Sequence, residues 1–185
     1  MPNWCSNTVE ISHENPEMIK RLEDAWKNDK FFGTIFPEPD YKTTPVAKTY
    51  PEIKAQFAKT EDEKAQALAN EPTISEDNWW DWRVQNWGTK WDIACQDHEY
   101  HVDGNHFHSF FSTAWSPPTG IYDKLVEQGY TVNAFYYEGG CAFCGQYADG
   151  EDETYSLDGD WKEVRNTIPA SIDNEFDISE EMRMD

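Results

Sequence analysis

The segment from Trp79 to Trp91, WWDWRVQNWGTKW, contains five of the nine tryptophans of this 185-residue chain within thirteen positions. Large aromatic side chains at helical spacing usually bury their surface against other elements of a fold. We therefore expect a helix that packs against a sheet, with Ser75 as its N-cap and Gly88 at its end. Its expected apolar stripe consists of Trp80, Val84, Trp87 and Trp91. The alternative is a surface platform for stacking a ring, which Trp79 and Trp82, lying off the stripe, would supply.

The rest of the chain alternates between strand-like and helix-like segments. Strands with period-two alternation are predicted at 4–11, 90–97, 106–114 and 130–137. Amphipathic helices are predicted from Pro16 to Trp26 and from Ser116 to Gly129. The resulting order is the split βαβ arrangement of a ferredoxin-like fold. The predicted class is α+β, an antiparallel sheet with helices on one face, extended by a C-terminal β-hairpin at 141–147 and 154–157.

The length of the chain suits one hydrophobic core, so we expect a single ferredoxin-like domain over residues 1–160. Residues 37–74 are rich in proline and charge, and we interpret them as an inserted surface segment. Their Ala, Lys, Glu and Gln content predicts short helices at 51–58 and 61–69. Residues 161–185 are predicted to be an acidic C-terminal tail whose last dozen residues are mobile.

The formal net charge is −21, and most of it lies in the second half of the chain. Residues 1–92 carry eleven Lys/Arg and seventeen Asp/Glu, a net of −6, whereas residues 93–185 carry four and nineteen, a net of −15. Such a field repels nucleic-acid phosphates and anionic membranes and attracts basic protein surfaces. The alternative is that the acid only keeps a tryptophan-rich protein soluble. The predicted partner-binding acids are Asp149, Glu151, Asp152, Glu153, Asp158 and Asp160.

Four short motifs, in order, give the chain a resemblance to a known family. They are MPNWCSNTVEI at the start, NWGTKWD at 86–92, FSTAWSPP at 111–118 and YYEGG-x-x-F-x-G-x-Y at 136–147. The chain thereby resembles the YubB-type, Api-like ferredoxin-like family of phage and plasmid proteins of unknown function. The resemblance covers roughly residues 1–160 and implies an antiparallel ferredoxin-like domain and a mobile-element origin. It brings no catalytic residues with it.

The sequence contains no Gly-rich phosphate loop, GxSxG turn or HExxH helix, so we predict a non-enzymatic protein. Our hypothesis is a phage or plasmid counter-defence protein that binds and inhibits a basic host protein, by analogy with acidic DNA mimics. The alternative is a protein that binds or sequesters a nucleotide-like signal. Its stacking residues would be Trp79, Trp82, Trp115 and Tyr137. Few cations lie near these motifs to hold an anionic ligand.

Two groups of residues resemble metal ligands without matching a recognised motif. His98, His101, His106 and His108 fall within eleven residues. A solvent-exposed hairpin accounts for them equally well. Cys141 and Cys144 form a lone CxxC in a strand-like context, and zinc would need two further ligands. We therefore predict no metal and no cofactor.

Neither a membrane-spanning run nor a signal peptide is evident, so we expect a protein of the host-cell cytoplasm. Direct nucleic-acid and membrane contacts are not expected, because the net charge is strongly negative. The oligomeric state stays open, since an exposed sheet edge can pair with a second copy or be covered by the chain itself.

Overall fold

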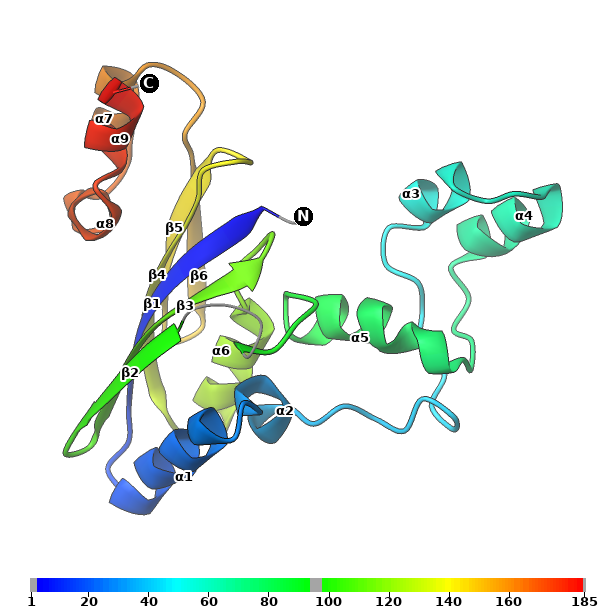
Figure 1. Cartoon of the computed structure of the whole chain (residues 1–185), viewed down its shortest axis with the longest axis horizontal. Helices are drawn as coiled ribbons and strands as arrows, with labels where there is room; N and C mark the ends of the chain where they lie inside the picture. Colours follow the sequence, from blue (N-terminus) through cyan, green and yellow to red (C-terminus); the bar gives the residue numbers. More distant parts are fainter. Residues whose placement is uncertain (1–2, 94–97, 185) are drawn as a thin grey trace.

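The computed structural model describes residues 3–93 and 98–184 (Figure 1). The strands are β1 (Trp4–Ser12), β2 (His98–Asp103), β3 (His106–Ala114), β4 (Thr131–Glu138), β5 (Phe143–Ala148) and β6 (Glu151–Ser156). The helices before β2 are α1 (Pro16–Lys27), α2 (Phe31–Ile35), α3 (Pro51–Gln56), α4 (Glu61–Ala69), the 3-10 turn η1 (Glu76–Asn78) and α5 (Trp79–Asn86). Those after β3 are α6 (Thr119–Glu127), α7 (Trp161–Thr167), α8 (Ala170–Phe176) and α9 (Ile178–Met184).

The six strands form one sheet in the order β2-β3-β1-β4-β5-β6, and all neighbouring strands run antiparallel. Strands β1 to β4 with α1 and α6 follow the ferredoxin-like order, and β5 and β6 add a hairpin beside β4. The predicted α+β fold with an antiparallel sheet is therefore confirmed.

The residue pattern of strand β1 explains why one face of the sheet is buried in the core. Its residues alternate between half-buried and buried along the whole strand, so that Val9 and Ile11 face the core while Thr8 and Glu10 face the other way. Helix α1 begins at Pro16 because Asn15 accepts a hydrogen bond from the Glu17 backbone N–H. Its apolar face then packs into the same core as α6.

The predicted strand at 90–97 is wrong for the residues that the structure describes. Residues 90–93 form no strand, 94–97 lie outside the described residues, and the edge strand is β2, which begins at His98. Asp92 explains the difference, because its carboxylate accepts hydrogen bonds from the backbone N–H groups of Phe32 and Gly33 at the start of α2. This part of the chain therefore caps a helix instead of pairing with a strand.

The tryptophan helix exists, but its predicted stripe is only partly right. Trp87 is 1% exposed and belongs to the core, and Gly88, with φ at 88°, follows it in the left-handed region. The prediction is wrong at the other three positions of the stripe. Trp91 lies beyond the end of α5 at Asn86, and Trp80 and Val84 are only half-buried.

Helix α5 buries Asp81 instead of an apolar stripe. The Asp81 carboxylate accepts a hydrogen bond from the Thr49 backbone N–H and forms an ion pair with Lys54 of α3. In Figure 1, α5 extends from the sheet toward α3 and α4, which lie far from the strands. Helix α5 therefore holds the inserted segment in place and also packs against the main core.

The C-terminal residues form three short helices that cover part of the second face of the sheet. Val164, Ile172 and Ile178 are buried in a cluster that includes Cys144 and packs on Phe135 and Tyr137. These two residues alternate along β4 with Val132 and Ala134 of the main core, so they face the opposite side. In Figure 1, α7–α9 lie across the sheet from α1 and α2. The mobility expected for the last dozen residues is wrong, because Phe176, Ile178 and Met182 pack in this cluster. Helices therefore lie on both faces of the sheet.

Candidate functional site

The six acids predicted to bind a partner lie on or next to β6, at one edge of the sheet. Strand β6 contains Glu151, Asp152 and Glu153, Asp149 precedes it in the β5–β6 turn, and Asp158 and Asp160 follow it. All six residues are exposed. We refer to these six residues as the acidic edge.

Three members of the acidic edge also stabilise the fold locally. Asp149 accepts a hydrogen bond from the Val132 backbone N–H at 2.9 Å, and Asp160 caps α7. Asp152 accepts one from the Tyr136 hydroxyl at 2.8 Å. Although the residue as a whole is exposed, partial burial of its carboxyl raises the pKa of Asp152, and this hydrogen bond works against that rise.

The other three acids, Glu151, Glu153 and Asp158, carry charge without capping a helix or turn. Glu153 accepts hydrogen bonds from Tyr155 and Gln146, which lower the pKa of its carboxyl. Within residues 3–93 and 98–184, no Lys or Arg forms a salt bridge with any member of the acidic edge. The edge therefore presents uncompensated negative charge to solvent.

The four predicted stacking residues lie in different environments. Trp79 lies against the Arg83 guanidinium, and the half-buried Trp82 packs on Phe36 and Trp87 at the margin of the main core. Tyr137 lies under the C-terminal helices, where its hydroxyl donates a hydrogen bond to Glu181. These three residues therefore contact different parts of the fold.

Trp115 is the most exposed of the four, at 41%. Its φ of 71° is uncommon for a bulky residue, and its ring lies 4.0 Å from Lys90 Nζ. The same ammonium lies 3.8 Å from the Trp91 ring centroid, so one cation contacts two indoles. The arrangement joins the end of the tryptophan segment to the end of β3.

The histidines separate into two groups. The His98 ring packs edge-on against Trp26, which places it on the core side of β2. His106 and His108 lie two residues apart on the outer face of β3, and their rings stack with centroids 6.0 Å apart. His101 of β2 lies directly opposite His108 in the register.

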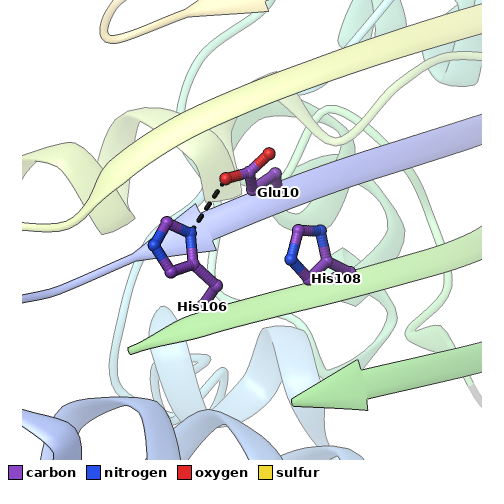
Figure 2. Close-up of side chains that lie close together, drawn as sticks. All are labelled: Glu10, His106 and His108. Atoms are coloured by element: carbon purple, nitrogen blue, oxygen red, sulfur yellow. Dashed lines mark hydrogen bonds and ion pairs between the residues drawn. The ribbon is translucent and has the colours of Figure 1, made fainter. Parts of the chain in front are cut away.

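Glu10 of β1 joins the two outer histidines, as Figure 2 shows. Its Oε1 lies 2.9 Å from His106 Nδ1, and in the register Glu10 is paired with His108. One potential ligand atom from each of Glu10, His106 and His108 lies within 4.8 Å of the other two. The sequence analysis missed Glu10, whose position follows only from the β1–β3 pairing.

The cysteines do not assemble into a site within the described residues. Cys144 is buried beneath the C-terminal helices, whereas Cys141 is exposed in the preceding turn. Burial raises the pKa of the Cys144 thiol to about 11 and that of Cys5 higher still. Both buried thiols are therefore protonated near neutral pH, which disfavours metal binding and nucleophilic chemistry. Cys95 lies outside the described residues.

No known protein-family model matches the chain, and no curated protein is similar to it in sequence. A solved structure that it resembles is protein api92 from Yersinia pseudotuberculosis, of the family model DUF1281. The similarity covers 86% of this chain and 99% of api92, with 10% identity and a TM-score of 0.46. Among the described helices, none has the length and apolar composition to span a bilayer.

Proposed function

We propose that the chain is a non-enzymatic protein that binds and inhibits a basic host protein through the acidic edge. The observation that supports this most directly is the position of β6, the last strand in the sheet order, with exposed carboxylates at three successive residues. An edge strand is accessible to a partner along its length. Since successive side chains point to opposite faces, a basic partner meets negative charge on both sides of this edge.

The charge also determines which partners are favoured. A chain with a net charge of −21 is steered toward basic surfaces and away from nucleic acids. Proteins that bind nucleic acids have such basic surfaces. The motif resemblance to phage and plasmid proteins supports a mobile-element origin, a cytoplasmic location in the host and a counter-defence role. The partner is then a host protein whose phosphate-binding surface the acidic edge occupies.

The test is a pull-down from host lysate at low and high salt, with and without competing DNA. We expect a basic protein to be captured at low salt and released by both salt and DNA, because the three compete for the same surface. A partner whose capture is unaffected by salt and by DNA would contradict the proposal.

A charge-matched pair of variants locates the binding surface. The first variant replaces four members of the acidic edge by their amides: Glu151→Gln, Glu153→Gln, Asp158→Asn and Asp160→Asn. Asn remains a good N-cap at position 160, so α7 keeps its start. The control neutralises four exposed acids of the inserted segment: Glu52→Gln, Glu61→Gln, Asp62→Asn and Glu71→Gln. Capture should fall for the first variant and persist for the control. Equal loss in both would show that net charge, and not the acidic edge, is responsible.

A further inference from the structure

The outer face of the sheet contains a group of side chains that the acidic-edge proposal does not use. Glu10, His106 and His108 come from the adjacent strands β1 and β3 and point to the same side (Figure 2). Strands β4 and β5 separate β1 from β6, so this group lies away from the acidic edge. None of the three residues is buried.

We propose that Glu10, His106 and His108 bind a divalent transition-metal ion of the zinc type. Two imidazoles and one carboxylate form a ligand set that suits such ions and leaves at least one coordination position open. The three ligand atoms lie within 4.8 Å of one another. Ligands that share one zinc ion at about 2.0–2.1 Å are about 3–3.5 Å apart, so only small side-chain rotations are required.

The backbone supplies the geometry of this site. His106 and His108 share a face because they are two residues apart on one strand, and the β1–β3 register sets Glu10 opposite His108. The contact of 2.9 Å between Glu10 Oε1 and His106 Nδ1 already brings two donors together. When the ion binds Nδ1, the imidazole proton resides on Nε2, so the neutral ring can serve as ligand.

His101 can complete the coordination. It is paired with His108 across β2 and β3, and directly opposed residues have Cβ atoms about 4.5–5.5 Å apart. His101 and His108 also line the same shallow hollow, together with Thr8 and Glu175.

The experiment is a calorimetric titration of the full, tag-free chain with Zn²⁺ in the presence of a competing chelator. We expect one Zn²⁺ per chain. His106→Gln and His108→Gln should each weaken binding at least tenfold, since even residues that only support a ligand contribute about 10- to 100-fold. Glu10→Gln should do the same. Exposed positions tolerate these changes, and circular dichroism checks that each variant is folded.

The matched controls are His13→Gln and Glu14→Gln, which remove an imidazole and a carboxylate nearby on the chain but outside the group. Both should bind Zn²⁺ as the natural protein does. The His101→Gln variant shows how many residues bind the ion. Its Zn²⁺ affinity should equal that of the natural protein if three residues are ligands, and it should be weaker if His101 is a fourth ligand.

Substitution with Co²⁺ identifies the donor atoms. We expect ligand-field absorption without a thiolate-to-cobalt charge-transfer band, and the Cys141→Ser variant should give the same spectrum. The proposal is overturned if the natural chain shows no saturable Zn²⁺ binding. It is also overturned if the His106→Gln/His108→Gln double variant binds as tightly as the natural chain, or if the Co²⁺ spectrum shows thiolate ligation.

Discussion

Trp87 is the member of the tryptophan-rich segment that joins the segment to the rest of the core. Its indole is 1% exposed, and Nε1 donates a hydrogen bond of 2.9 Å to the Phe36 carbonyl oxygen. Phe32 and Trp82 contact the ring edge-on. The side chain therefore combines a large buried area with a satisfied polar atom, which is the usual condition for a buried tryptophan.

Trp87→Ala is expected to lower the free energy of unfolding by about 3–5 kcal/mol, because it leaves a cavity and an unpaired carbonyl group. Urea denaturation measures the change. Trp115→Ala is the control, since that ring is 41% exposed and should cost much less. A loss below about 1 kcal/mol for Trp87→Ala would contradict its role in the core.

Glu38 connects the loop after α2 to α5 and makes part of the stability depend on pH. Arg83 Nε and Nη2 donate to its two oxygens at 2.8 and 2.6 Å, and the Tyr41 hydroxyl donates at 2.6 Å. Burial alone would raise the pKa of Glu38, but these hydrogen bonds outweigh burial and hold it below the usual value. The carboxylate therefore stabilises the folded state above the pKa of an unfolded Glu, about 4.3, and this contribution disappears as the pH falls through the folded pKa.

Glu38→Gln should accordingly be less stable than the natural protein near neutral pH, with the difference shrinking as the pH falls below about 4. Urea denaturation of both proteins at several pH values measures it. Glu52→Gln, which changes an exposed glutamate, should follow the natural protein at every pH. A difference between Glu38→Gln and the natural protein that does not vary with pH would refute this account.

At the scale of elements, α7, α8 and α9 depend on the sheet for their stability. Each has seven residues, which is too short for an isolated helix in water. Their apolar residues cover Phe135, Tyr137 and Cys144. Burial of that surface stabilises both the helices and this side of the sheet.

Removal of residues 161–185 should therefore expose Cys144 to thiol reagents. In the full chain this thiol is buried and its pKa is raised to about 11, so it should react slowly. Ellman titration of both forms, each carrying Cys5→Ser, Cys95→Ser and Cys141→Ser, isolates the signal of Cys144. Equal reactivity in the full and truncated chains would mean that the helices do not cover it.

The elements with strong local patterns could be predicted from the sequence, whereas those set by distant contacts could not. The period-two alternation of residue types over 4–11 and the Asn15 cap with Pro16 are local signals, and they located β1 and α1 correctly. Residues 90–93 alternate like a strand, but Asp92 bonds to α2 some sixty residues earlier, which no local pattern reveals. Glu10 could not be predicted for the same reason. Only the β1–β3 register, which pairs distant parts of the chain, places it beside His106 and His108.

At the scale of the whole molecule, the charge is unevenly distributed over a single antiparallel sheet. The strand at one edge carries the exposed acids, and residues 93–185 together have a net charge of −15. Excess charge of one sign keeps a protein soluble but repels itself in the compact state. The acidic edge should therefore be a local source of instability as well as a binding surface.

Added salt is expected to raise the thermal midpoint, because the Debye length falls from about 10 Å at 0.1 M to about 3 Å at 1 M and screens this repulsion. Differential scanning calorimetry of the natural chain and of the variant with four neutralised acids of the acidic edge measures the effect. The variant should have the higher thermal midpoint at low salt, and added salt should raise its midpoint by less than that of the natural chain. If added salt raises the midpoints of both proteins equally, the repulsion arises elsewhere on the surface.

The two ends of the inserted segment lie next to each other, which makes the segment suitable for carrying an added tag. Val46 and Thr73 form a two-residue antiparallel bridge, with reciprocal backbone hydrogen bonds of 2.9 and 3.0 Å, so the chain leaves and returns at nearly the same point. The helices between them, α3 and α4, lie far from the strands in Figure 1. The turn between α3 and α4, residues 57–60, is therefore a natural place to insert a fluorescent reporter or affinity tag while leaving the Lys54–Asp81 ion pair, the sheet, its acidic edge and its histidine face intact.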